Sequence, residues 1–181
     1  MKPTDFLHYI PVLISNRLSA AVFGDHREQE PSHGVPSLYF GEAPVSKITP
    51  EFIGEVTQGI VVSACSLAVQ RPVYWLRPLP EMQVDVPRWM ARKAFIYGES
   101  LQVAISRDDL NERHSVSNSV PDQAAETCGI QVLDPALYLC SETQCNGSRN
   151  DRPLYYDVHF LSEFGNKYLV SLFATLFWAQ L

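Results

Sequence analysis

The chain has 181 residues, with 14 Lys and Arg against 20 Asp and Glu, and a formal net charge of −6 at pH 7. This length predicts a single domain that spans residues 1–181. Hydrophobic residues make up 46% of the chain, which is enough for a packed core and excludes wholesale disorder. The acidic balance argues against a nucleic-acid binder with a generally basic surface, because neutralising phosphates requires clustered Lys and Arg.

The sequence shows no membrane-spanning or export segment. Its longest weakly polar stretches fall short of the roughly 20 apolar residues that cross a bilayer. Residues 1–5 lead into no run that reads as the apolar core of a signal peptide. As written, the sequence therefore predicts a cytoplasmic location.

The cysteines match no zinc-binding spacing, and no metal or other cofactor is expected. Two alternatives remain open for them. Either all four stay reduced, or the last two close a small loop if the compartment is oxidising. The four are Cys65, Cys128, Cys140 and Cys145.

Short apolar runs predict three buried strands, at Val12–Ser15, Val73–Leu76 and residues 130–133. Helical spacing of apolar residues follows Thr49-Pro50-Glu51, a typical helix start. Helices between short buried strands favour an α/β fold with a parallel sheet covered on both faces.

Further helices are expected in the second half. One opens at Val86 and stops at Gly98, and another begins with a cap at Ser106 and ends at Gly129. Pro121 should break or restart the latter. A last helix, capped by Ser162, carries one apolar stripe. Residues 137–156 read as irregular.

In parallel sheets, sites lie beyond the carboxyl ends of the strands. This rule points to Asn16 after the first strand, Arg77 and Glu81 after the second, and Asp134 after the third. We expect Arg77 and Glu81 to act as ion-pair partners or loop anchors, and Asp134, before a proline, to form a turn.

The densest polar cluster is Tyr155-Tyr156-Asp157-Val158-His159-Phe160-Leu161-Ser162. An Asp just before a His can accept the Nδ1–H of the imidazole and leave Nε2 as a base. Such pairs are more often ordinary surface-loop residues, so the pair Asp157 and His159 is weak evidence when taken alone.

Several stretches of the sequence resemble a known family and give further support to a role for Asp157 and His159. From residue 71 onward the chain resembles the C-terminal part of the SGNH (GDSL-like) domain that is fused to acyltransferase-3 membrane proteins. Those fusions acylate cell-envelope sugars. The resemblance reaches, more weakly, back to PVLISNR and PSLYFGEAPV, and its main stretches are RPVYWLRPLPEMQVDVPRWMARKAF, CGIQVLDPALYLC and RPLYYDVHFLSEFGNKYL.

The resemblance implies an SGNH hydrolase-like fold, a flavodoxin-like three-layer α/β/α sandwich with a parallel sheet, here without its N-terminal strand or strands. It also implies acyl transfer through a Ser nucleophile, with an Asp and a His in one late loop. Asp157 falls on the family's Asp, and Asn16 is the candidate oxyanion-hole residue. The implied partners are an acyl donor, a carbohydrate acceptor and an acyltransferase-3 membrane domain encoded upstream. The implied location is periplasmic and tethered to the membrane.

This sequence departs from the family pattern at two places. The family's His sits three residues after the Asp, where this chain has Phe160, and His159 is one position early. The Gly-Asp-Ser nucleophile block is absent. Gly24-Asp25-His26 has His where Ser is needed, and Ser100 follows a predicted helix rather than a strand, so neither fits a nucleophile turn.

Two functions therefore remain open. In the first, the chain is the C-terminal portion of an SGNH acyltransferase or esterase domain, inactive by itself because its Ser lies in sequence before Met1. In the second, it is a non-catalytic remnant or an interaction module. Whether the chain is an enzyme stays undecided at this point. A nucleotide-binding flavodoxin-like module is disfavoured, because the chain has no glycine-rich phosphate loop.

Overall fold

The computed structural model describes residues 10–23, 47–98 and 102–178. Within these ranges, β1 (Val12–Ser15), β2 (Val73–Leu76) and β4 (Gln131–Leu133) form a parallel sheet in the order β1-β2-β4. The three predicted strands and their parallel pairing are confirmed, and β4 begins one residue later than expected. β2 lies in the centre, so its carboxyl end is flanked by those of both neighbours.

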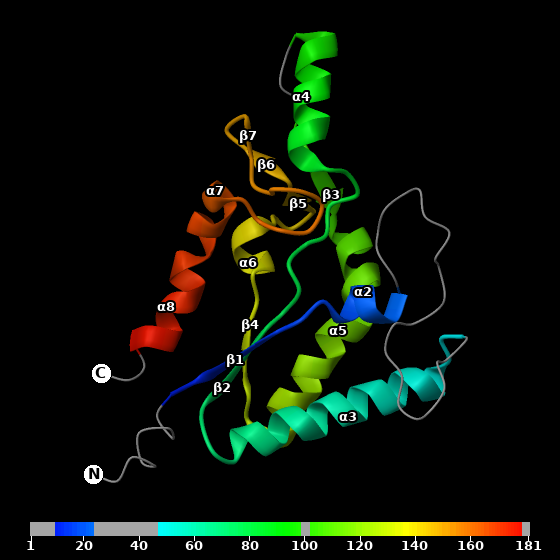
Figure 1. Ribbon diagram of the computed structural model, residues 1–181, viewed down its shortest axis with the longest axis vertical. Helices are drawn as coiled ribbons and strands as arrows, with labels where there is room; N and C mark the ends of the chain where they lie inside the picture. The colour runs from blue at the N-terminus through cyan, green and yellow to red at the C-terminus, as the bar shows by residue number, and fades with distance from the viewer. Residues whose placement is uncertain (1–9, 24–46, 99–101, 179–181) are drawn as a thin grey trace.

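Alternation along β2 places its side chains in two separate cores. Val73 and Trp75 pack with residues of α3 (Pro50–Ala68) and α5 (Arg107–Cys128). Tyr74 packs on the opposite face, in the core that includes α8 (Val170–Trp178). Figure 1 shows α8 on one side of the strands and α3 and α5 on the other. The predicted α/β architecture is therefore confirmed, and the sheet is covered on both faces at its central strand. The prediction of a buried strand is wrong for β1, an edge strand on which Leu13 is exposed.

The predicted helix starts are confirmed by their capping bonds. The Phe52 N–H donates to Thr49 Oγ1 over 3.2 Å, and the Asp109 N–H donates to Ser106 Oγ over 3.0 Å. Gly129 ends α5 with φ of 73°, a left-handed conformation that glycine adopts without strain.

The predicted break at Pro121 is wrong, because α5 runs through this residue. Pro121 costs the helix one N–H donor. The residue is fully buried in α5 beside Val120 and close to the buried Ala124. Burial of this helix face against the sheet and the neighbouring helices outweighs one lost hydrogen bond.

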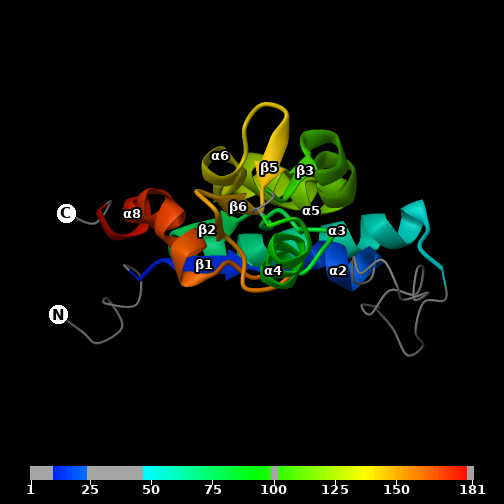
Figure 2. The ribbon, with the colours of Figure 1, turned by 90° about the horizontal axis from the view of Figure 1, so that it is seen from above.

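The helix α4 (Val86–Tyr97) follows the prediction from Val86 to the stop at Gly98. The Arg88 N–H donates to Asp85 Oδ1 over 3.0 Å and caps its start. Figure 1 shows α4 standing away from the rest of the molecule, and Figure 2 looks down on it nearly end-on. Only the base of this helix is part of the core.

The region predicted to be irregular, residues 137–156, contains three short strands and most of a short helix, and one of its strands pairs with a strand that lies before α5. β3 (Ala104–Ser106) pairs antiparallel with β5 (Gln144–Asn146), and β6 (Ser148–Arg149) pairs with β7 (Arg152–Pro153). α6 (Ala136–Leu139) follows β4. These strands of two or three residues are too short to show a period in the sequence.

The C-terminal helix is divided. The Gly165 N–H donates to Ser162 Oγ over 3.1 Å, so the predicted cap is confirmed. The chain then forms α7 (Glu163–Asn166), the 3₁₀ turn η1 (Lys167–Leu169) and α8. α2 (Leu18–Phe23) completes the fold and packs on α5.

All four cysteines are joined in disulfides. The expected Cys140–Cys145 bridge is present, with the Cα atoms 3.9 Å apart. The alternative of four reduced thiols is wrong, because Cys65 and Cys128 also form a bridge. This second bridge connects α3 to α5 across a sequence separation of 63. Such a pairing cannot be read from spacing, since only the fold brings the two helices together.

Gly165 is required by a close approach of two backbones. A Cβ at this position would overlap the carbonyl oxygen of Leu154. We expect Gly165→Ala to lower the free energy of unfolding by about 2 kcal/mol, as overpacking a tight site does. Urea unfolding followed by circular dichroism measures the change.

Gly54→Ala is the matched control, because a Cβ there meets nothing within 4 Å and the residue lies exposed in α3. The control should stabilise the protein by about 0.5–1 kcal/mol through helix propensity. Equal effects of the two substitutions would contradict the close packing of Gly165.

Candidate functional site

The late polar cluster forms a closed loop, residues 154–162, called the site loop below. The Tyr156 N–H donates to the Phe160 carbonyl over 2.7 Å, and the Ser162 N–H donates to the Leu154 carbonyl over 2.9 Å. Tyr155 and Leu161 form an antiparallel bridge at its neck. These backbone bonds give the loop a defined shape.

The buried Tyr155 anchors the neck of the loop. Burial raises the pKa of the Tyr155 hydroxyl far above its usual range, so the phenol stays neutral. Its ring belongs to the same core as Tyr74 of β2.

Asp157 shapes the turn that carries His159 and Phe160. Asp157 Oδ1 accepts hydrogen bonds from the N–H groups of both residues, each over 2.7 Å. These two bonds are of the kind by which Asp side chains stabilise turns. Asp157 therefore holds the backbone of His159. A contact of this carboxylate with the imidazole stays a prediction from the sequence.

The site loop is also bonded to the segment that links β2 to α4. The Met82 N–H donates to the Val158 carbonyl over 2.8 Å, and the Val86 N–H approaches the Asp157 carbonyl at 3.5 Å. These contacts bring residues near position 158 to the carboxyl end of β2. The positions of the site loop and of α4 are thereby coupled.

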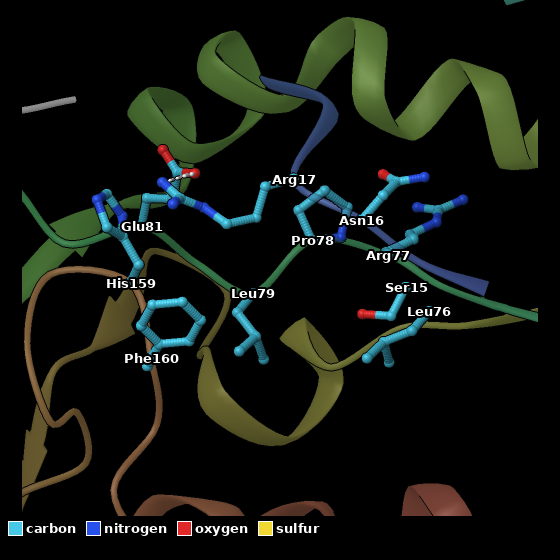
Figure 3. A pocket seen from close by; sticks show the side chains of 10 residues that line it. All are labelled: Ser15, Asn16, Arg17, Leu76, Arg77, Pro78, Leu79, Glu81, His159 and Phe160. Atoms are coloured by element: carbon cyan, nitrogen blue, oxygen red, sulfur yellow. Dashed lines mark ion pairs between the residues drawn. The ribbon is translucent and has the colours of Figure 1, made fainter. Parts of the chain in front are cut away.

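A pocket of about 390 Å³ lies where these segments meet. It is bordered by the carboxyl ends of β1 and β2 and by the site loop. In the view of Figure 3, His159 and Phe160 lie at one end with Arg17 and Glu81, and Asn16 and Arg77 lie at the other. The lining residues are Ser15, Asn16, Arg17, Leu76, Arg77, Pro78, Leu79, Glu81, His159 and Phe160.

The structure thus brings together most of the residues that the sequence singled out. Asn16, Arg77, Glu81 and His159 all line this one pocket, as the rule for parallel sheets predicts. Asp157 is not among the lining residues. The Gly24-Asp25-His26 segment and Ser100 lie outside the described residues.

Glu81 is a buried carboxylate in the wall of the pocket, with only 5% of its surface exposed. Arg113 of α5 donates from Nε to Glu81 Oε2 over 3.0 Å, and Arg17 Nη2 lies 3.5 Å from Oε1. A buried charge is tolerated only when it is paired in this way. The expectation of an ion-pair role for Glu81 is confirmed, and its partners come from the turn after β1 and from α5.

The pairing also positions Arg17 over the site. Its guanidinium lies 6.0 Å from the ring centroid of Phe160, within the range of a cation–π contact. Sequence reasoning missed Arg17, although it directly follows Asn16 at the end of a strand. It also missed Arg113, which lies in the middle of a long helix where the sequence gives no signal.

Arg77, which lines the pocket, belongs to a second charged group together with Asp134. Arg77 is paired with Asp122 and, at 3.5 Å, with Asp134. Asp134 Oδ1 also accepts the Ala136 N–H over 2.8 Å, which confirms the turn-forming role expected of it. Arg77 is therefore held by two carboxylates that do not line the pocket.

A third polar group lies buried between α2 and α5. Ser19 Oγ is 2.7 Å from His114 Nδ1 and 2.6 Å from Ser117 Oγ. This is the contact distance of a nucleophile and its base. Ser19 is 1% exposed, however, so a substrate cannot reach it, and the group is a structural one.

Comparison with known protein families shows which family this chain belongs to. A family model described as "SGNH domain (fused to AT3 domains)" matches residues 8–175. The chain belongs to this family. The resemblance seen in the sequence is therefore confirmed, and it extends over nearly the whole chain.

The solved structures that the SGNH chain is similar to include the periplasmic domain of a lipopolysaccharide acetyltransferase from Salmonella ser. Paratyphi A. The two are 14% identical with a TM-score of 0.47, and the match covers 93% of this chain and 82% of the other. A comparison with curated proteins found no significant match. In the part of the SGNH chain that the structure describes, no helix is long and apolar enough to span a membrane.

The buried Glu81 gives a test of the site's construction. Arg113→Met removes one of its two partners and leaves a poorly compensated buried charge. We expect a loss of about 3 kcal/mol in the free energy of unfolding, measured by urea denaturation. The double variant Glu81→Gln/Arg113→Met should lose less, because no charge is left buried.

Arg92→Met on the exposed surface of α4 is the control and should change stability by less than about 0.5 kcal/mol. A double variant as unstable as the single one would show that the ion pair is not what Arg113 contributes.

Proposed function

We propose that this SGNH chain is part of a Ser-dependent O-acyltransferase or esterase domain that acts on O-acyl groups of cell-envelope carbohydrates. The observation that carries the proposal is the pocket at the carboxyl ends of β1 and β2, closed by a site loop that bears an Asp and a His. This arrangement occurs in a chain that belongs to a family with acyltransferase-3 fusions.

The pocket offers two of the groups that acyl transfer needs. Asn16 is exposed at the end of β1 and supplies an amide N–H₂ that can face a developing oxyanion. His159 supplies an imidazole as the candidate base. Asp157 acts as a positioning residue, because it fixes the turn on which the imidazole stands.

The chemistry would follow the usual course of acyl transfer. A Ser oxygen attacks the ester carbonyl while the imidazole accepts its proton, and the imidazolium returns that proton to the departing alcohol. The acyl group then passes to a sugar hydroxyl or to water. The exposed ring of Phe160 and the side chain of Leu79 offer apolar surface for the acyl group or for a sugar face.

We place the nucleophile on a Gly-Asp-Ser segment, which this sequence does not contain. Among the described lining residues, Ser15 has the only hydroxyl, and it lies within the register of β1 rather than on a strand-to-helix turn. The chain alone is then inactive, and a Gly-Asp-Ser segment completes it. The acyl donor would be handled by an acyltransferase-3 membrane domain in the same protein. The disulfides support an oxidising, periplasmic location for the domain.

A non-catalytic interaction module is the second candidate, and the site loop gives a specific reason for it. Phe160 occupies the position of the family's His and cannot exchange protons. His159 is 6% exposed, so its access to a substrate is restricted. A binding function would keep the pocket without the need for a base.

Fluorophosphonate labelling separates the two candidates, because an activated Ser displaces the fluoride and becomes covalently marked. The chain as it stands should neither label nor hydrolyse a short-chain acyl ester. A version with a Gly-Asp-Ser strand and turn placed ahead of β1 and with Phe160→His should do both. Loss of a nucleophile or base costs on the order of 10⁶-fold in a serine protease, so the contrast is large.

Asp157→Asn in the completed version should lower turnover, since an amide oxygen holds the turn more weakly than a carboxylate. Lys47→Gln, on the exposed surface before α3, is the control and should not change turnover. A completed version that folds and stays inactive would favour the interaction module. Labelling of the unmodified chain at a Ser would overturn the assignment of the nucleophile.

A further inference from the structure

The outer half of α4 has no packing partner among the described residues. Val86 and Met90 at its base are buried, whereas its last turn, residues 94–97, is exposed on every side. Phe95 is 92% exposed, and Ile96 and Tyr97 are more than half exposed. Figure 1 shows this end of the helix as the part of the described chain that extends furthest from the sheet.

The charge of α4 is opposite to that of the whole chain. The helix VPRWMARKAFIY contains Arg88, Arg92 and Lys93 and no Asp or Glu. The chain as a whole has a net charge of −6. A cluster of cations on a protruding element of an acidic protein complements an anionic surface.

The aromatic residues of α4 are interleaved with these cations. Lys93 Nζ lies 5.4 Å from the ring centroid of Trp89 and 5.0 Å from that of Tyr97. The ammonium of Lys93 thus lies close to two amphipathic rings. Trp and Tyr concentrate at the boundary between lipid headgroups and acyl chains, and basic residues beside them bind anionic headgroups.

We infer that the end of α4, formed by Arg92, Lys93, Phe95, Ile96 and Tyr97, binds the surface of a bilayer that contains anionic phospholipids. The two cations pair with lipid phosphates while Phe95 and Ile96 enter the headgroup region. A single cluster of this size gives weak and reversible binding, suited to a domain that is held nearby by another attachment.

Membrane binding through α4 would orient the pocket. The base of α4 is bonded to the site loop through the Val86 N–H and the Asp157 carbonyl, and Met82 just before it is bonded to Val158. A contact at the far end of α4 therefore fixes the height of the pocket above the lipid surface. This inference stands on the composition and exposure of α4 and does not depend on the proposed acyl transfer.

Vesicle co-sedimentation of the full chain tests the inference. Vesicles of phosphatidylcholine alone are compared with vesicles that contain 30% phosphatidylglycerol, at about 50 mM and 500 mM salt. We expect binding to the anionic vesicles at low salt, and much weaker binding to neutral vesicles or at high salt. Binding that is equal for the two lipid compositions would overturn the inference, as would no binding to either.

The variant Arg92→Gln/Phe95→Ser should reduce partitioning at least tenfold, because one cation near an anionic surface is worth about fivefold and the lost ring adds to this. The matched control is Lys47→Gln/Val69→Ser, which removes one exposed cation and one exposed apolar side chain from the region of α3. It should retain binding within about twofold of the unmodified chain.

Equal losses in the two variants would show that binding is not localised to α4. Light scattering without lipid provides a further check against a second copy of the chain as the occupant. Self-association that Arg92→Gln/Phe95→Ser abolishes would assign the surface to a protein contact and overturn the lipid assignment.

Discussion

The backbone contact between the site loop and the segment after β2 is the constraint on which the candidate site depends. The Met82 N–H to Val158 carbonyl bond brings a stretch more than seventy positions later in the sequence onto the carboxyl end of the central strand. Without it, the Asp and the His would lie on a separate loop away from Asn16. Gly165 contributes to the same constraint, because its missing side chain lets α7 approach Leu154 and close the neck of the loop.

The charges around the pocket follow from that placement. Glu81 lies in the interior on the same segment, and two arginines, one from the turn after β1 and one from α5, compensate its charge. One of them, Arg17, then lies over Phe160. One carboxylate oxygen of Asp157 accepts hydrogen bonds from two backbone N–H groups. These two bonds fix the shape of the turn. The side chains at positions 159 and 160 then decide which chemistry the loop can support.

The sequence predicted the regular parts of the fold well, since VLIS and VYWL are short apolar runs of the kind found in strands, and Thr49 and Ser106 carry the capping chemistry of helix starts. The prediction failed for features that depend on tertiary contacts. Pro121 is tolerated because α5 is packed along its length, and the Cys65–Cys128 bridge depends on two helices meeting. In the site, strand ends pointed to Asn16 and Glu81, whereas Arg113 and the backbone role of the Asp157 carboxylate arise from the folded arrangement alone.

The central claim is that the pocket between β1, β2 and the site loop receives an acylated carbohydrate. Titration of the ¹⁵N-labelled chain with an O-acetylated oligosaccharide, followed by NMR, tests it most directly, because binding does not require the nucleophile. The account predicts saturable shifts of the amide signals of Asn16, His159 and Phe160 with the acetylated sugar, with Gly54 of α3 unaffected. The deacetylated sugar, which is the acceptor in acyl transfer, should shift the same three signals. Shifts confined to other surfaces, or no saturable shifts with the acetylated sugar, would contradict it.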